Sequence, residues 1–363
     1  MFKCLVIVEL LASLAACTTS PDASGDAGPP DAPGSVAPDA APFTSGVSTL
    51  AGAAEAGDVD GDRSVGRFAN PTNVLRAPSG NVYVADFDNG QIRVVDPAGT
   101  TATLIHQADF SRPFGMALAP NGVLYVETDN APGGAHSTTT GAIWKIEAGA
   151  HTAVAIGTNL GRPRGLAMLA DGRLAMADHM HHVVEIFDPR TGKAVILAGK
   201  FDAPGYADAT GASARFTSPY GVAVRADGRL LVTDYGNQRI RVVDPVSGAT
   251  TTLAGTGVAG FADGELKAAQ FNLPQGIAID DDGTIYLTDT GNYRVRRIRG
   301  ETVDTLAGDG VGGFKDADDR LTAQFWGLEG LAVARDGMTI YVADGSRGDA
   351  SPYNRVRLID MTP

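Results

Sequence analysis

The sequence predicts an all-β fold, a six-bladed β-propeller formed by one domain over residues 47–363. Three observations predict it: six copies of one segment, four short strand-like stretches in most copies, and chain ends that complement each other. The composition agrees, because the 363 residues include 46 Gly, 20 Pro and 44% hydrophobic residues. Such a chain has many tight turns and enough apolar surface to build a large core.

The internal repeat is the first of these observations. Its six copies centre on Asp86, Thr128, Asp178, Asp234, Asp289 and Asp344, which lie 42 to 56 residues apart. A period of this length is typical of repeated units that cannot bury their apolar faces alone and pack against their neighbours. Six copies therefore predict six blades.

Each copy contains short apolar stretches that read as strands. In the fourth copy these stretches are residues 221–224, 230–233, 239–243 and 250–253. Alternating apolar positions and β-branched residues favour strands at all four. Asp227-Gly228 separates the first two stretches, and Asn-Gly or Asp-Gly pairs stand at the same place in four other copies. These pairs are strong hairpin signals.

The two ends of the repeat region complement each other. The last copy has three strand-like stretches, at residues 328–334, 339–343 and 355–359, and no fourth. The missing stretch matches Val47-Ser-Thr-Leu-Ala-Gly52, which repeats Thr251-Thr-Leu-Ala-Gly255. We therefore expect the N-terminal strand to complete the last blade and close the ring, which leaves no frayed edge blade.

Three motifs recur in the copies and stand most clearly in the fifth. They are Pro274-Gln-Gly-Ile-Ala278, Ile285-Tyr-Leu-Thr-Asp289 and Asn292-Tyr-Arg-Val-Arg296. They resemble the NHL-repeat family of six-bladed propellers, over roughly residues 47–361. The resemblance implies the fold but no single activity, since the family includes enzymes, sensors and adaptors. Related lactonase propellers use Glu with Asn or Asp in the channel, for which Glu329 and Asn73 are the candidates.

The N-terminal residues have the features of a targeting signal followed by a tether. Residues 1–16 are typical of a signal peptide, and Leu14-Ala-Ala-Cys17 resembles the bacterial lipobox. The resemblance implies that Cys17 is lipidated and anchors the protein in the cell envelope; an ordinary secretory signal is the alternative. Thr18, rather than Asp, favours the outer membrane. Residues 17–46 are rich in Pro, Ala and Asp and are expected to form a disordered tether.

Charge and cysteine content exclude several classes of function. The formal net charge is −13, from 29 basic and 42 acidic residues, which argues against a nucleic-acid partner. Only two cysteines are present, which excludes a disulfide scaffold and a cysteine-based zinc site. We expect a monomer that needs no cofactor, with a divalent metal as the alternative discussed below.

The direction of the strands predicts which face binds a ligand. Loops that enter first strands and loops that join second to third strands share one face, and the insertions lie there: 51–66, 130–141, 200–215, 256–270, 309–324 and 345–354. One residue of each first strand should point into the channel mouth on this face: Thr72, Phe114, Arg164, Tyr220, Gln275 and Glu329. Their variety indicates a rim that contacts a protein, peptide or glycan ligand.

The repeated aspartate is interpreted as structural. The expected ion pairs are Asp234–Arg239, Asp289–Arg294 and Asp344–Arg355. The second copy replaces both members, by Thr128 and Ala142, as joint loss of a buried pair would. The arginines of the third strands are expected to face outward and to pair with neighbouring acids: Arg93, Arg241, Arg296 and Arg357.

The third copy departs from this rule and carries the alternative function. Asp178 remains, Val183 stands at the arginine position, and His179, His181 and His182 follow Asp178 closely. Imidazole and carboxylate groups suit a divalent metal or a general base, so the alternative is a metal-dependent hydrolase or lyase with a channel site near the third blade. A solvated loop or an Asp–His pair would explain the same residues.

Overall fold

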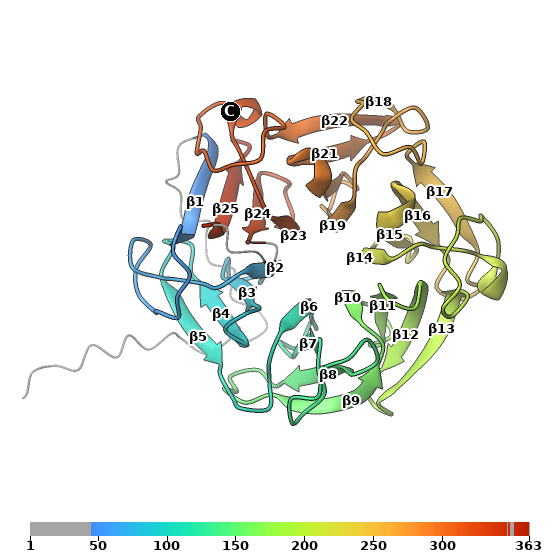
Figure 1. Ribbon diagram of the computed structural model, residues 1–363, viewed down its shortest axis with the longest axis horizontal. Helices are drawn as coiled ribbons and strands as arrows, with labels where there is room; N and C mark the ends of the chain where they lie inside the picture. Colours follow the sequence, from blue (N-terminus) through green and yellow to red (C-terminus); the bar gives the residue numbers. More distant parts are fainter. Residues whose placement is uncertain (1–44, 347, 349–351, 363) are drawn as a thin grey trace, which may run out of the picture.

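The computed structural model describes residues 45–346, 348 and 352–362, and it shows six antiparallel sheets arranged around a central channel (Figure 1). Residues 1–16, Cys17 and most of the expected tether lie outside the described residues. Within the described part, no helix is long and apolar enough to cross a bilayer.

The first three blades each contain four consecutive strands. Blade one consists of β2 (Pro71–Arg76), β3 (Val82–Asp86), β4 (Gln91–Val95) and β5 (Thr101–Ile105). Blade two consists of β6 (Pro113–Leu118), β7 (Leu124–Thr128), β8 (Gly141–Ile146) and β9 (Val154–Leu160). Blade three consists of β10 (Pro163–Met168), β11 (Leu174–Asp178), β12 (Val183–Asp188) and β13 (Lys193–Gly199).

The last three blades include one additional strand and the ring closure. Blade four consists of β14 (Pro219–Val224), β15 (Leu230–Asp234), β16 (Arg239–Val243) and β17 (Thr250–Ala254). Blade five consists of β19 (Pro274–Ile279), β20 (Ile285–Asp289), β21 (Arg294–Arg299) and β22 (Thr302–Ala307), with β18 (Gly264–Glu265) on its outer edge. Blade six consists of β23 (Leu328–Val333), β24 (Thr339–Asp344), β25 (Asn354–Asp360) and β1 (Gly46–Ala53).

In the described residues, four short 3-10 helices lie in the connections between strands. They are η1 (Gly211–Ser213), η2 (Tyr235–Asn237), η3 (Thr290–Asn292) and η4 (Arg320–Thr322). η2 and η3 follow directly on β15 and β20, on the face that carries the insertions, where they turn the chain into the third strand.

The predicted ring closure is confirmed. β1 pairs antiparallel with β25, with Val47 opposite Ile359 and Thr49 opposite Arg357. β1 is thus the outer strand of blade six, far in sequence from the other three strands (Figure 1). Six core clusters fill the spaces between neighbouring blades, one in each space. Burial between blades is what makes a short four-stranded sheet stable.

The repeated aspartate forms a structural ion pair, but the expected partner was wrong. Asp234 Oδ2 accepts a hydrogen bond of 2.6 Å from Nη1 of Arg241, and not from Arg239. The Arg239 guanidinium instead lies 3.9 Å from the centre of the Tyr206 ring. Both strand positions neighbour Asp234, but only Arg241 projects into the interior of the blade. The same pairing joins Asp86 to Arg93, Asp289 to Arg296 and Asp344 to Arg357.

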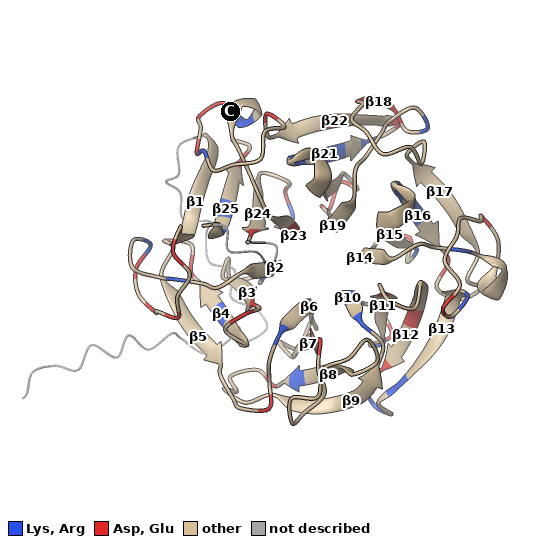
Figure 2. Ribbon diagram, in the orientation of Figure 1, with Lys and Arg blue, Asp and Glu red and all other residues tan. Residues whose placement is uncertain are grey.

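The third-strand arginines are therefore buried, which corrects the expectation that they face outward. Arg93, Arg241, Arg296 and Arg357 are fully shielded from solvent, and Figure 2 shows the basic positions on β4, β16, β21 and β25. Each guanidinium also bonds to a second aspartate in an insertion loop: Asp60, Asp208, Asp263 or Asp316. A cation between two carboxylates offsets the cost of burying it.

Blades two and three replace this arrangement in different ways. In blade two, Trp144 stands at the arginine position and its Nε1 donates to the hydroxyl of Thr128 at 2.8 Å. In blade three the position holds Glu185 on β12. Burial raises the pKa of Glu185 to about 7, and nearby Asp178 raises it further. Neither Ala142 nor Val183 is the residue that replaces the arginine.

We expect Glu185→Gln to stabilise the protein at alkaline pH. With its raised pKa, Glu185 holds a proton in the folded state between about pH 4.5 and 7, where the unfolded chain has released it. Stability from this group therefore falls as the pH rises through that window. Removing the carboxyl should add about 2–3 kcal/mol at pH 8 and little at pH 4, measured by urea unfolding. Glu301→Gln, at an exposed position, is the control.

Candidate functional site

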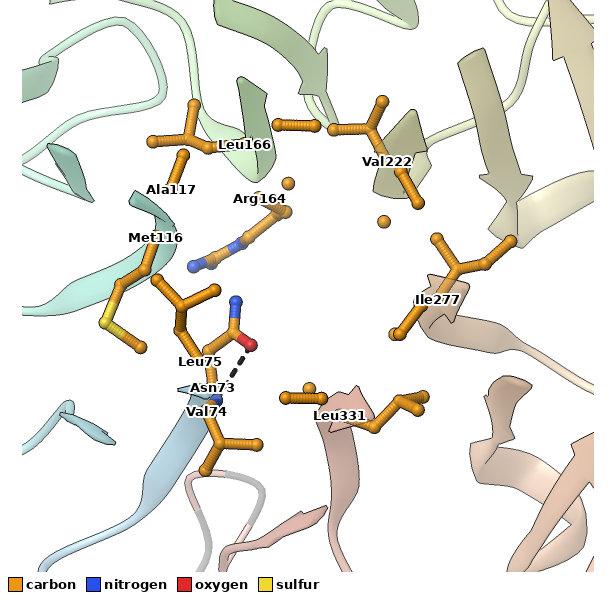
Figure 3. A pocket seen from close by; sticks show the side chains of 18 of the residues that line it. Asn73, Val74, Leu75, Met116, Ala117, Arg164, Leu166, Val222, Ile277 and Leu331 are labelled. Carbon is orange, nitrogen blue, oxygen red and sulfur yellow. Dashed lines mark hydrogen bonds between the residues drawn. The ribbon is translucent and has the colours of Figure 1, made fainter. Parts of the chain in front are cut away.

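All six blades contribute to the lining of a central channel. Its cavity has a volume of about 300 Å³ and is lined by the first strands, β2, β6, β10, β14, β19 and β23. Most of the lining is aliphatic, as Figure 3 shows for Leu75, Leu166, Val222, Ile277 and Leu331. Polar groups are few, and the Arg164 side chain extends from β10 toward the neighbouring strand β6, which carries Met116 (Figure 3).

Four of the six predicted rim residues line this cavity. Phe114, Arg164, Tyr220 and Glu329 do so, and we refer to these four as the mouth cluster. Thr72 and Gln275 lie outside the lining. The hydroxyl of Thr72 donates to the carbonyl oxygen of Pro113 at 3.3 Å, which ties blade one to blade two.

Members of the mouth cluster contact each other across the channel. The rings of Phe114 and Tyr220 meet edge to face with centroids 5.6 Å apart. The Tyr220 hydroxyl donates to Glu329 Oε2 at 3.2 Å, from blade four to blade six. The Arg164 guanidinium lies 4.1 Å from the centre of the Phe114 ring, a cation–π contact. Three blades on one side of the ring thus meet a fourth blade opposite.

An acidic pair that the sequence analysis missed holds Arg164 in place. Arg164 Nη2 donates to Asp129 Oδ2 at 3.2 Å, and Nη1 lies 3.0 Å from Asp129 Oδ1. Glu127 is fully buried next to Asp129, and burial raises its pKa well above its ordinary value, with the Asp129 charge adding to the effect. A comparison of the copies could have identified Glu127. Blades one and four hold Ala85 and Thr233 at the equivalent position of the second strand, where blade two holds an acidic residue.

The histidine segment of blade three is divided among separate roles. His179 packs its ring against Tyr220 and Tyr235, at centroid distances of 5.3 and 5.6 Å. Burial lowers its pKa to about 4, with Arg164 lowering it further, so the ring is neutral at physiological pH. His181 instead contacts Asp202, Nδ1 to Oδ1 at 2.7 Å, and stacks on Phe201. His179 therefore extends the mouth cluster, and His181 points toward an insertion loop.

His182 has an interblade role that recurs elsewhere in the ring. Its Nδ1 accepts a hydrogen bond of 3.0 Å from the backbone N–H of Ser218 in the next blade. Gln238 Oε1 accepts the equivalent bond from Leu273 at 2.6 Å. Because an accepting Nδ1 carries no proton, this contact selects the neutral ring.

Asp178 is occupied with backbone groups. Its Oδ1 accepts from the N–H groups of Arg162, Met180 and His181 at 3.0 to 3.2 Å. The four residues considered for a metal are therefore held in four different environments. No group of three or more His, Cys, Asp or Glu side chains within the described residues is placed to hold a metal ion.

The fold defines the class: the described part of the chain is a six-bladed β-propeller, and two of its blades match the NHL repeat. The family model for the NHL repeat matches residues 216–243 and 271–298, which span the first three strands of blades four and five. These are the two blades that carry the predicted motifs in their fullest form.

Known proteins with similar sequences are much longer than this chain. It is 36% identical over 163 residues to Protein SUPPRESSOR OF QUENCHING 1, chloroplastic, of Arabidopsis thaliana, covering 41% of this chain and 15% of that protein. It is 33% identical over 153 residues to NHL repeat-containing protein 2 of Bos taurus, covering 39% of this chain and 21% of that one. The chain thus spans about a fifth or less of either relative.

Among solved structures, the chain resembles an auxiliary nutrient binding protein from Bacteroides thetaiotaomicron. The TM-score is 0.67 with 16% sequence identity, over 86% of this chain and 76% of the other. At this identity the likeness concerns the fold alone.

Proposed function

We propose that the chain is a binding module that takes a protein, peptide or glycan ligand at the channel mouth. One observation carries the proposal: four different side chains from four blades meet there, in contact with one another. Structural packing of a propeller does not require such variety, whereas a ligand site combines apolar surface with a few convergent polar groups. The auxiliary nutrient binding protein shows that a similar fold can serve a binding role.

Each member of the mouth cluster offers a different contact to a ligand. The rings of Phe114 and Tyr220, which are 3% and 8% exposed, line the channel and provide apolar surface for a ligand. Arg164 is fixed by Asp129 and presents N–H donors to a carboxylate or a hydroxyl group. Glu329 is half-buried and provides a carboxylate acceptor on the opposite side of the mouth. A rigid, preformed site of this kind binds with little loss of side-chain entropy.

Arrays of immobilised glycans and peptides test the proposal. We expect the protein to bind a defined subset and Arg164→Ala to weaken that binding by about tenfold or more, because a charge-assisted hydrogen bond is lost. Arg229→Ala is the matched control, since Arg229 lies in an exposed turn and pairs only locally with Asp227. Unchanged binding by Arg164→Ala, with thermal unfolding like that of the control, would place the site elsewhere.

We also propose that Cys17 carries a lipid that anchors the propeller in the cell envelope, at the outer membrane. The proposal rests on Leu14-Ala-Ala-Cys17 and on Thr18 after the cysteine. Cys17→Ser should move the protein from the membrane fraction to the soluble fraction, because acyl chains supply the attachment. Persistence of the variant in washed membranes would show that something other than Cys17 holds the protein there.

A further inference from the structure

In four blades an insertion loop covers the outer edge of the sheet. In blade four, the N–H of Thr250 donates to the carbonyl oxygen of Ala209 at 2.8 Å. In blade six, Val47 and Ala317 exchange two backbone hydrogen bonds of 2.8 and 2.9 Å. Gly61 covers β5 of blade one in the same way, and β18 covers β22 of blade five. A short antiparallel segment thus lies along each of these outer strands.

The covers are held by one repeated set of side chains. The loop aspartate that binds the buried arginine also accepts a hydrogen bond from a threonine of the outer strand. The four pairs are Asp60–Thr103, Asp208–Thr252, Asp263–Thr305 and Asp316–Thr49. Loop, arginine and threonine therefore work as a unit that closes the outer edge.

Blade three lacks all three parts of this unit. The connection from β9 to β10 is only two residues long, and Glu185 replaces the arginine. Register places Ile196 opposite Glu185, where Thr252 stands opposite Arg241 in blade four. Among the described residues, β12 is the only element that forms backbone hydrogen bonds with residues 193–196. The first half of β13, on the periphery of the ring (Figure 1), is therefore an open strand edge.

The open edge adjoins a groove with both apolar and polar lining. This cavity of about 530 Å³ lies between β13 and the turn at Pro245–Ser247, with the charged residues Arg173, Asp188 and Lys193 in its lining. Three apolar side chains are exposed here: Val195 at 68%, Ile196 at 41% and Val246 at 90%. Lys193 is exposed and has no ion-pair partner in the described part of the chain. Exposed apolar side chains beside an open edge mark an interaction surface.

We propose that the outer edge of blade three binds an extended segment of a partner protein, which adds to β13 as an antiparallel strand. The segment places apolar side chains beside Val195 and Ile196, which face opposite sides of β13, and a carboxylate beside Lys193. This is β-strand addition, in which main-chain hydrogen bonds give affinity and pockets for alternate side chains give specificity.

The covers of the other blades support this occupant. Each is an extended segment that pairs antiparallel with the outer strand. In blade four, the N–H of Thr252 points outward and donates to Asp208. Ile196 stands at the equivalent position in blade three. Its N–H therefore faces the groove, and its apolar side chain replaces the threonine hydroxyl that would bond a loop of the same chain. The inference does not depend on the channel mouth, which lies at the opposite, inner end of each blade.

A phage-displayed library of random peptides, selected on the whole protein, tests the proposal. We expect selected peptides to alternate apolar residues and to include Asp or Glu. A synthetic peptide of the selected sequence should slow amide hydrogen exchange at Ala194 and Ile196, and leave Thr252, which is already covered, unchanged. Ile196→Pro, which removes one outward N–H, and Ile196→Lys, which adds charge, should each weaken binding by about tenfold or more.

Val258→Lys is the matched control, because Val258 is similarly exposed on the insertion loop of blade five. Three results would overturn the proposal: selection of no peptide, peptides whose binding is insensitive to both Ile196 variants, or a selected peptide that protects other strands. Sedimentation of the free protein adds a fourth. A dimer that Ile196→Lys dissolves would assign the edge to a second copy of this chain instead.

Discussion

Replacing Arg241 by Met should destabilise the protein by about 3–5 kcal/mol at pH 8, since the change leaves a buried carboxylate without its cation. Asp234 and Arg241 are both fully buried, and they meet at 2.6 Å. Asp208, the second partner of Arg241, is partly exposed and can be solvated by water. Most of the cost therefore comes from Asp234.

The pH dependence separates this cause from a simple loss of packing. Burial raises the pKa of Asp234 to about 6 even though Arg241 opposes the shift. Without the arginine the pKa rises further, so the carboxyl is neutral in the folded variant at pH 5. The folded variant then holds a proton that the unfolded chain releases above pH 4, and stability falls as the pH rises. The loss caused by Arg241→Met should thus be clearly smaller at pH 5 than at pH 8.

Urea unfolding at pH 5 and at pH 8 measures the loss of stability. A double variant then tests whether the unpaired carboxylate causes that loss. Asp234→Asn with Arg241→Met removes the charge together with the cation, and it should be more stable at pH 8 than Arg241→Met alone. Arg229→Ala provides an exposed arginine for comparison and should leave the urea midpoint unchanged. An equal loss at both pH values would mean that the arginine contributes through its volume.

The fold could be predicted because the chain contains six versions of the same unit. Blade number, the turn between first and second strands, and the role of Val47-Ser-Thr-Leu-Ala-Gly52 all follow from comparing copies. The partner of Asp234 could also have been identified this way. Arg239 and Arg241 recur together in blades four to six, but blade one keeps Asp86 and Arg93 and has Gln91 at the position of Arg239. The structure adds that the second arginine, Arg239, lies on the Tyr206 ring.

The sequence predicted only those parts of the candidate site that lie at equivalent positions of the repeat. First-strand register placed Phe114, Arg164 and Tyr220 at the channel because the position is the same in each blade. Glu127 and Asp129 escaped notice because a buried acid next to Arg164 depends on packing between two blades. Likewise, the histidines look like a cluster in sequence. In three dimensions His182 is directed to Ser218, so proximity along the chain was misleading.

Ring closure gives the second large expected effect, through Leu50→Ala in β1. Leu50 is fully buried in the cluster between blades six and one, with Phe68, Tyr341 and Leu358. Truncation of such a leucine costs about 2–5 kcal/mol through lost burial and the remaining cavity. Because β1 is the strand that completes blade six, the same change should also let it detach and open the edge of β25.

Leu231→Ala in blade four is the matched control that separates ring opening from ordinary core loss. Leu231 is equally buried, but its strand is continuous in sequence with the rest of its blade. Both variants should lower the urea midpoint, and only Leu50→Ala should speed amide exchange along β25 ahead of global unfolding. If β25 exchanges at the same rate in both variants, β1 is held by more than its core contacts. The hydrogen bonds from Val47 to Ala317 and from Thr49 to Asp316 would then be the anchors to remove next.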